Sequence, residues 1–208
     1  MQNLSKYAGF RRLDLDDRHH LWQGQLPSHL LPNAAQFEDL WQLHPDEYNT
    51  IQIHGRVVKT PRWEQAFNQS YCYSGYTNLA KSVPEAIMPI WEWIKVKVDA
   101  RLNGILMTWY DGSLGHYIGK HRDSTQNLIP GSPIVTLSLG ESRVFRMRPW
   151  QGNGYQDFPV HSGMVFVMPY ATNSAWTHEV PMAKKYVGQR IAITFRAFMG
   201  SALEGATT

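Results

Sequence analysis

The chain has 208 residues, of which 43% are hydrophobic and 18% are charged. These values are ordinary for a globular protein, and this length can bury a core without disulfides or a structural metal. The formal net charge of +3 is compatible with a nucleic-acid partner but far below that of an arginine-rich binding protein. The single cysteine, Cys72, excludes an intrachain disulfide and a cysteine-rich zinc site.

No segment has the pattern of a targeting or membrane-spanning element. The N-terminus lacks an apolar core of signal-peptide length, and no apolar run approaches the roughly eighteen residues that would cross a bilayer. Repeats and low-complexity tracts are also absent from the sequence. We therefore expect a monomeric, cytoplasmic protein with no membrane partner, formed by a single domain over residues 1–208.

The N-terminal part begins with residues 1–30, which are polar and rich in His and Arg. We expect this segment to wrap irregularly on the core. Asn33 followed by Gln36 has the pattern of a capping box. Apolar residues on one helical face follow it, so a helix is predicted over residues 33–43.

Two more elements are predicted before residue 100. Residues 51–58 (IQIHGRVV) alternate as in a single strand. Pro89 suits the first turn of a helix, and an apolar stripe follows it at Ile90, Trp91, Ile94 and Val98. Residues 1–100 are therefore predicted to form a helical layer and a lid over the substrate.

From Gly104 onward the sequence consists of short apolar or alternating runs separated by turns that contain Gly and Pro. The runs are ILMTWY, PIVTLSL, RVFRMR, MVFVMP, AWTHEV and RIAITFRAF. Several short strands with intervening turns are typical of a β-sandwich or jelly roll. The predicted fold class is mainly β with N-terminal helices (α+β), with a jelly-roll core over residues 101–200.

A candidate metal site begins at His121 and Asp123, which are separated by one residue. On a strand, two such side chains point to the same face. With His178, from a later strand, they would form the two-His, one-carboxylate triad typical of non-heme Fe(II) oxygenases. The alternative is that His178 is an ordinary histidine at a strand end, since a His-x-Asp pair alone rarely marks a metal site.

The strand at residues 190–196 carries an arginine at each end. Its alternation places Ile191, Ile193 and Phe195 on one face and both arginines on the other. Two arginines on an inward face would be costly without anionic partners. Six residues at about 3.3 Å each separate their backbones by roughly 20 Å, so two long side chains can share one small dianion such as 2-oxoglutarate. An exposed strand face is the alternative, and the triad favours the dianion.

The order of these residues resembles AlkB-type dioxygenases. The matching residues are His121-x-Asp123, His178, Arg190 and Arg196. The twelve-residue spacing from His178 to Arg190 resembles the branch that contains mammalian DNA-repair homologues, as do the stretches IGKHRD and PGSPIVTLSLGESRVFRMR. The resemblance covers roughly residues 55–198. It implies a double-stranded β-helix, a bound Fe(II), and 2-oxoglutarate and O2 as co-substrates.

The resemblance also implies roles for individual residues. The two histidines and the aspartate of the triad would hold iron. Arg190 would bind the distal carboxylate of 2-oxoglutarate, and Arg196 would act at the end nearest the metal. Thr108-Trp109-Tyr110 stands where the family has Asn-x-Tyr, so Tyr110 and Thr108 are assigned to the co-substrate site.

The candidate substrate residues also come from the resemblance. Pro61-Arg62 and Tyr73-Ser74-Gly75 resemble the family's substrate lid, and Arg143-x-Phe145 resembles an Arg-x-Phe strand whose role is either structural or in substrate contact. The substrate candidates are Arg62, Tyr73, Ser74, Ser124 and Arg143.

The sequence departs from the family pattern at three places. Ser124 stands where repair-type members commonly carry a second acid that contacts the substrate base. Ala192 replaces an asparagine that would give the co-substrate a hydrogen bond, and the loop over residues 110–121 is rich in glycine. The iron and co-substrate residues are retained, whereas the residues for substrate recognition differ.

The family removes N-methyl groups by hydroxylation, after which formaldehyde is lost. We therefore expect oxidative demethylation of N-alkylated nucleobases in DNA or RNA. The aromatic residues in segment 63–76, with Arg62 nearby, suit a flipped base, although they also suit a flap packed on the sandwich. Ser124 favours an alternative, hydroxylation of a small molecule or a protein side chain. A non-catalytic binding module and a zinc hydrolase are further alternatives, and both leave the two arginines unexplained.

Overall fold

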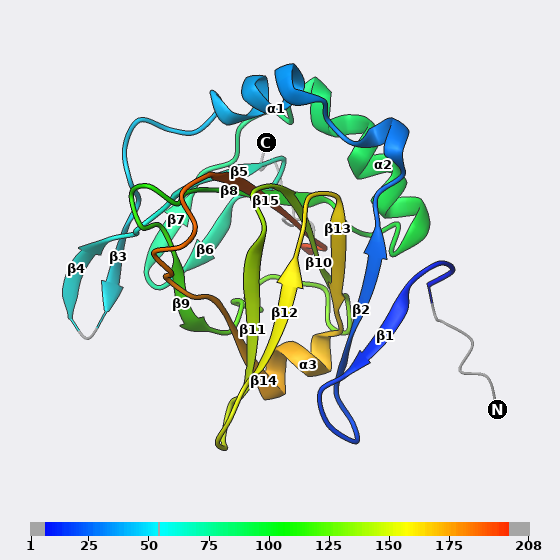
Figure 1. Cartoon of the computed structure of the whole chain (residues 1–208). Helices are drawn as coiled ribbons and strands as arrows, with labels where there is room; N and C mark the ends of the chain where they lie inside the picture. Colours follow the sequence, from blue (N-terminus) through cyan, green and yellow to red (C-terminus); the bar gives the residue numbers. More distant parts are fainter. Residues whose placement is uncertain (1–6, 54, 200–208) are drawn as a thin grey trace, which may run out of the picture.

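Two antiparallel sheets face each other in the computed structural model, which describes residues 7–53 and 55–199 (Figure 1). The large sheet contains, in spatial order, β1 (Arg11–Asp14), β2 (His20–Gln25), β13 (Met164–Met168), β10 (Ile134–Gly140), β15 (Gln189–Arg196), β8 (Gly104–Asp111) and β5 (Trp63–Phe67). The small sheet contains β12 (Gln156–Val160), β11 (Arg143–Pro149), β14 (Trp176–Val180) and β9 (Ile118–His121). The predicted β-rich jelly-roll core is confirmed.

Two hairpins lie outside these sheets. They are β3 (Thr50–Ile53) with β4 (Arg56–Lys59), and β6 (Tyr71–Tyr73) with β7 (Tyr76–Asn78). The prediction of a single strand over residues 51–58 was therefore wrong. Gly55, at a φ of 75°, provides the left-handed turn that folds this segment back on itself.

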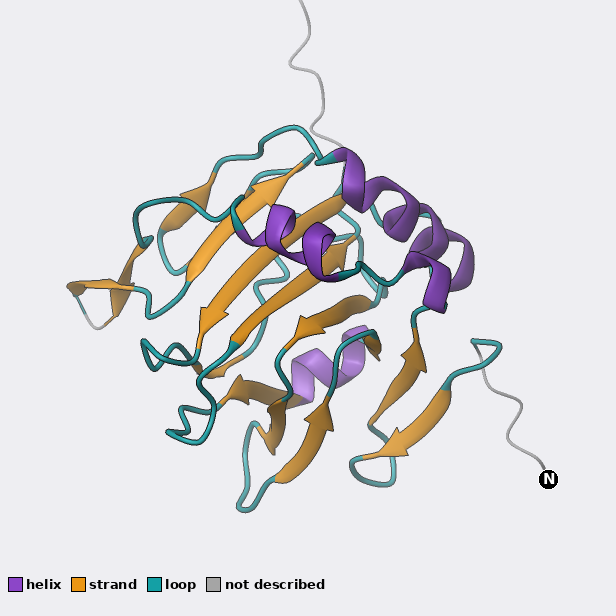
Figure 2. Ribbon diagram, turned by 45° about the horizontal axis from the view of Figure 1, so that its top comes forward, coloured by secondary structure: helices purple, strands orange, loops and turns teal. Residues whose placement is uncertain are grey.

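Helices α1 (Ala34–Trp41) and α2 (Met88–Lys97) cover the outer face of the large sheet (Figure 2). The capping box that predicted α1 is present, because the Asn33 side chain accepts from the Gln36 backbone and the Gln36 side chain accepts from the Asn33 backbone. The other helical segments are α3 (Tyr170–Ala175) and 3-10 turns at Ser28–Leu30 and Glu85–Ile87. Among residues 7–53 and 55–199, no helix combines the length and apolar character needed to cross a membrane.

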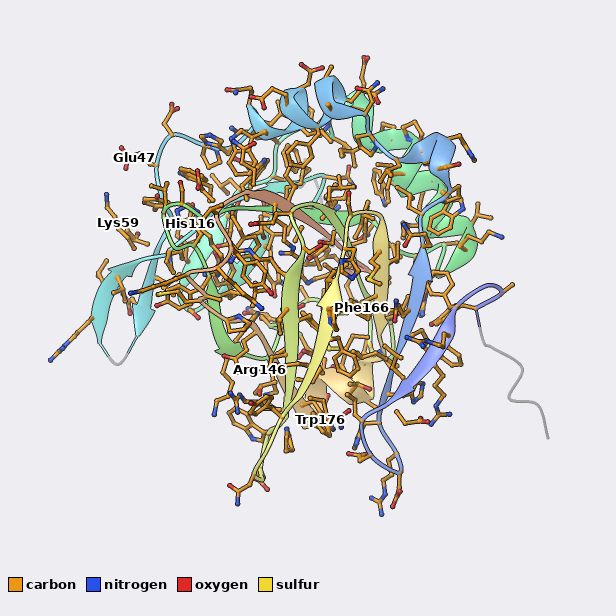
Figure 3. The ribbon with its side chains drawn as sticks, viewed as in Figure 1. Glu47, Lys59, His116, Arg146, Phe166 and Trp176 are labelled. Carbon is orange, nitrogen blue, oxygen red and sulfur yellow. The ribbon has the colours of Figure 1, made fainter. Side chains whose placement is uncertain are left out.

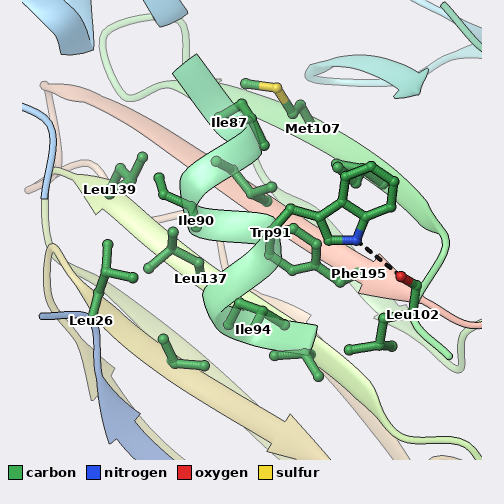
Figure 4. Close-up of a cluster of buried hydrophobic side chains, with 14 of the residues drawn as sticks. Leu26, Ile87, Ile90, Trp91, Ile94, Leu102, Met107, Leu137, Leu139 and Phe195 are labelled. Carbon is green, nitrogen blue, oxygen red and sulfur yellow. Dashed lines mark hydrogen bonds between the residues drawn. The ribbon is translucent and has the colours of Figure 1, made fainter. Parts of the chain in front are cut away.

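The main core lies between these helices and the large sheet. Ile90, Trp91 and Ile94 of α2 pack against strand residues such as Leu137 and Phe195 (Figure 4). The Trp91 indole Nε1 donates to the carbonyl oxygen of Leu102 at 3.0 Å, so its polar atom is satisfied within the core (Figure 4). The apolar stripe that predicted α2 is therefore its buried face.

A second apolar cluster fills part of the space between the two sheets. Phe166, labelled in Figure 3, comes from the large sheet, and its ring stacks on Phe145 of the small sheet with centroids 5.6 Å apart. Met147 and Trp176 belong to the same cluster. This cluster packs the two sheets together. The polar residues of β15 project into the neighbouring part of the space between the sheets.

The prediction that residues 1–30 wrap irregularly on the core was wrong for residues 7–30, and its first six residues lie outside the described part of the chain. β1 and β2 pair with each other, and β2 pairs with β13, so this segment extends the large sheet. Leu21 and Trp22 are buried by that pairing. The large sheet thus takes β1, β2 and β5 from the first hundred residues.

Gly140 ends β10 opposite Arg190, with a φ of 83°. A Cβ at this position would lie 2.4 Å from the carbonyl oxygen of Gln189 and 2.8 Å from the Phe37 ring. We expect Gly140→Ala to lower the free energy of unfolding by about 2–4 kcal/mol, measured by chemical denaturation. Gly131→Ala is the control, because Gly131 has a φ of 77° but a Cβ added there would meet no atom within 4 Å. Equal losses in the two variants would contradict the steric explanation.

Candidate active site

A cavity of about 390 Å³ lies between the two sheets. It is lined by His121, Asp123, His178, Thr108, Tyr110, Arg190, Arg196, Arg62, Tyr73, Ser74 and Ser124. The structure therefore brings together nearly all the residues that the sequence singled out. Arg143 is the exception, because it is buried and does not line this cavity.

Two of the triad residues lie on strands of the small sheet, and the third lies just after the end of β9. His121 is the last residue of β9 and pairs directly with His178 of β14, and their ring centroids are 4.2 Å apart. Asp123 lies beyond the end of β9, so the strand pleat alone does not orient it. Its backbone N–H donates to Asn173 Oδ1 at 3.0 Å, and Asn173 Nδ2 donates back to the Asp123 carbonyl at 3.1 Å. Asn173 of α3 thus fixes the position of Asp123.

The support for Asp123 extends to the N-terminal strands. Next to Asn173 in α3, the Thr172 hydroxyl donates to the carbonyl oxygen of His20 at 2.9 Å. Thr172 and Asn173 are both buried. One short helix therefore contacts the triad aspartate on one side and the start of β2 on the other.

The donor atoms of the triad fit a metal ion. The three residues offer ligand atoms that all lie within 4.8 Å of one another, and each histidine Nε2 is 3.6 Å from Asp123 Oδ1. The His121 Nδ1 must donate to the Gly119 carbonyl oxygen, 2.8 Å away, which leaves the Nε2 lone pair free for a metal. Asp123 Oδ2 accepts from Arg196 Nη2 at 2.7 Å, so Oδ1 remains for coordination. Two imidazoles and one carboxylate suit Fe(II).

The electrostatics keep these donors in the protonation states that metal binding requires. Burial opposes the charge of Asp123, but Arg196 and the two histidines outweigh it and hold the pKa of this carboxyl well below its usual range. Burial, with a further contribution from His121, lowers the pKa of His178 to about 3. At neutral pH the pair therefore offers a carboxylate and a neutral imidazole, the forms that bind a metal.

Arg190 and Arg196 project from β15 into the cavity, while Ile191, Ile193 and Phe195 are fully buried on its other face. The predicted alternation of this strand is confirmed. Arg190 Nε donates to Ser138 Oγ at 2.9 Å, whereas its Nη1 has no hydrogen-bond partner in the described part of the chain. A buried guanidinium with a free donor suits a bound carboxylate.

Thr108 and Tyr110 lie on β8, which pairs with β15. On β8, Tyr110 is opposite Arg190 and Thr108 is opposite Ala192. The Arg190 guanidinium is 5.0 Å from the centroid of the Tyr110 ring. Burial raises the pKa of the Tyr110 hydroxyl, so this group remains a hydrogen-bond donor at neutral pH. Both positions fit a contact with a co-substrate that lies along β15.

The substrate side of the cavity contains a polar network that the sequence analysis missed. Arg62 Nε donates to Glu64 Oε1 at 3.0 Å, and the Tyr73 hydroxyl donates to the other oxygen of Glu64. Glu64 is buried. Glu64 thus links β5 to the β6–β7 hairpin that carries Tyr73 and Ser74. A single glutamate in a strand gives no local signal of such a role.

Tyr71 lies in the aromatic segment 63–76 but was not named among the candidate site residues. Its hydroxyl accepts from the backbone N–H of Ser124 at 3.1 Å, and its ring lies 4.3 Å from the Arg196 guanidinium. The Tyr71 and Tyr73 rings are 5.4 Å apart, so two aromatic side chains from one hairpin line the cavity. Phe145 lines it from the small sheet, with its ring 5.3 Å from that of His178.

Comparisons with known proteins agree with this site. The model of the 2OG-Fe(II) oxygenase superfamily matches residues 28–196. Human DNA oxidative demethylase ALKBH2 is 29% identical over 164 residues, which cover 72% of this chain and 61% of that protein. The protein of the same name from Arabidopsis thaliana is 26% identical over 178 residues, covering 71% of this chain and 56% of that protein. The matches thus span about three fifths of these relatives.

The solved structure of OsALKBH1 has a similar fold. It superimposes with a TM-score of 0.54 and 17% identity, over 89% of this chain and 99% of that one. The chain belongs to the 2OG-Fe(II) oxygenase superfamily, and its similarity to the two demethylases supports the AlkB type within it. Fe(II), 2-oxoglutarate and O2 are the cofactor and co-substrates that this membership implies.

The triad geometry predicts the effect of losing one ligand. We expect His178→Ala to weaken Co(II) binding by more than about 100-fold in isothermal titration calorimetry, because two donors remain. His161→Ala is the control, since His161 lies away from the cavity and its Nδ1 is 2.7 Å from Ser142 Oγ. Unchanged Co(II) affinity in a folded His178→Ala variant would exclude His178 as a ligand.

Proposed function

We propose that this chain is an Fe(II)- and 2-oxoglutarate-dependent oxygenase that removes alkyl groups from N-alkylated bases of DNA or RNA. The observation that carries the proposal is one cavity with the triad on its small-sheet side, Arg190 on its large-sheet side and an aromatic hairpin along its edge. The relatives named as DNA oxidative demethylases support the nucleic-acid substrate. The monomeric state, the single domain and the cytoplasmic location stay predictions.

Each part of the proposed site has a distinct task. His121, Asp123 and His178 would hold the metal, which when bound would supply the oxidation of a substrate C–H bond by O2, coupled to conversion of 2-oxoglutarate into succinate and carbon dioxide. Arg190 binds the distal carboxylate of 2-oxoglutarate, and the Tyr110 hydroxyl donates to the same ligand. The apolar walls of the cavity limit the entry of water.

Arg196 acts on the metal side of the site. Its ion pair with Asp123 is buried and keeps that carboxylate ionised and oriented. Because Oδ2 accepts this pair, a single oxygen of Asp123 faces the two histidines. The three residues would thus hold a metal through one ligand atom each.

The substrate side supports a flat, flipped base. The Tyr71 and Tyr73 rings line the cavity 5.4 Å apart, and Arg62 and Ser124 add polar groups to its wall. Stacking on such rings stabilises an extruded base by about 1–3 kcal/mol per base. Ser124 keeps the alternative open, hydroxylation of a small molecule or a protein side chain, because it replaces the acid that commonly reads the base.

The proposed function predicts formaldehyde release. With Fe(II), ascorbate and 2-oxoglutarate, we expect formaldehyde and succinate to rise with a single-stranded oligonucleotide that carries 3-methylcytosine. The unmethylated strand and the His121→Ala variant are controls in which formaldehyde should be absent. Succinate release that is indifferent to the oligonucleotide would instead support a small-molecule or protein substrate.

Arg190 gives a second prediction for the same reaction. Arg190→Ala removes a charge-assisted contact with 2-oxoglutarate, which is worth about 1.5–3 kcal/mol. We expect the KM for 2-oxoglutarate to rise about 10- to 150-fold in a succinate-release assay, whereas Co(II) affinity changes little. A loss of metal affinity with an unchanged KM would contradict the assigned role.

A further inference from the structure

The buried arginines of the described chain differ in how their charges are balanced. Arg62 pairs with Glu64 at 3.0 Å, and Arg196 pairs with Asp123 at 2.7 Å. Arg143 and Arg190 are each only 2% exposed; Arg143 Nε lies 4.0 Å from the Glu141 carboxylate, and Arg190 forms no ion pair within the described chain. Two of these four buried cations thus have an acid within hydrogen-bond distance, and two do not.

Arg143 comes from β11 in the small sheet and is buried at the end of the sandwich where Arg190 lies. Its Nη2 donates to the carbonyl oxygen of His116, 3.4 Å away in the loop after β8 (His116 is labelled in Figure 3). Its Nε has no hydrogen-bond partner among the described residues, and the nearest carboxylate, that of Glu141, is 4.0 Å from it. The Glu141 oxygens already accept from the backbone N–H groups of Val187 and Gly188.

Arg143 and Arg190 lie at the same end of the sandwich. The backbone N–H of Glu141, whose carboxylate is the one nearest to Arg143, donates to the carbonyl oxygen of Gln189, the residue before Arg190, at 2.8 Å. Burial lowers the pKa of Arg190, Tyr110 opposes this shift, and the charge of Arg143 adds to it. Burial likewise lowers the pKa of Arg143, opposed by Glu141 and Tyr110. Two buried like charges, each with an unsatisfied donor, are costly unless an anion lies near them.

We propose that Arg143 is a positioning residue for the co-substrate, whose positive charge strengthens the binding of the distal carboxylate that Arg190 contacts. This inference rests on the proposed function. Arg143 does not line the cavity, so it acts through its electric field and not by touching the ligand. The two arginines together make this end of the site selective for a 2-oxo acid with a second carboxylate. This differs from the structural or substrate-contact role that the sequence resemblance suggested for Arg143.

The test compares two ligands that differ only at the distal end. Isothermal titration calorimetry with the Mn(II)-loaded protein gives the Kd of 2-oxoglutarate and of 2-oxopentanoate, in which a methyl group replaces the distal carboxylate. We expect Arg143→Gln to weaken 2-oxoglutarate by roughly tenfold or more and to leave 2-oxopentanoate unchanged. Arg143→Lys, which keeps the charge, should recover most of the loss. A general structural defect would weaken both ligands equally and would overturn the inference.

Glu141→Gln provides a matched variant that leaves Arg143 in place and is expected to change the affinity for 2-oxoglutarate in the opposite direction. It removes the negative charge nearest to Arg143, so 2-oxoglutarate should bind several-fold more tightly while 2-oxopentanoate is unaffected. Unchanged or weaker binding of 2-oxoglutarate would contradict the inference, even if Arg143→Gln failed to fold. If the unaltered protein did not prefer 2-oxoglutarate to 2-oxopentanoate, the proposed function itself would fail, which is a separate outcome.

Discussion

The alternation of β15 is the constraint on which the rest of the structure depends. Ile191, Ile193 and Phe195 are fully buried against the helical side, and the two-residue period of a strand then directs Arg190 and Arg196 into the space between the sheets. A slip of one residue would place the arginines in the apolar core. The hydrophobic packing that stabilises the fold therefore also fixes the direction of both charged side chains.

The Arg196–Asp123 ion pair links the large sheet to the segment that follows the small sheet's strand β9. Arg196 belongs to the large sheet, whereas Asp123 follows β9 of the small sheet, and both are buried. Breaking such a pair from one side would leave an uncompensated charge, which is strongly destabilising. The same contact thus joins the sheets and selects which oxygen of Asp123 faces the two histidines.

Much of this arrangement was predictable from local sequence, because periodicity and capping act over a few residues. The capping box at Asn33 and the two faces of residues 190–196 are examples. The strands of residues 1–30 were missed because their burial depends on β13, more than a hundred residues away. Glu64 was missed for a similar reason, since its partners Arg62 and Tyr73 meet only after the hairpin packs on β5.

The short helix α3 connects the N-terminal strand β2 to the triad residue Asp123, although β2 contributes no residue to the triad. Thr172 holds the backbone at His20, and the adjacent Asn173 holds the backbone at Asp123. Through α3, β2 thereby helps to hold Asp123 in position. Sequence changes that weaken the pairing of β2 would therefore displace the Asp123 carboxylate slightly. Substitutions in the N-terminal strands of the large sheet are thus constrained by the metal site at the small sheet.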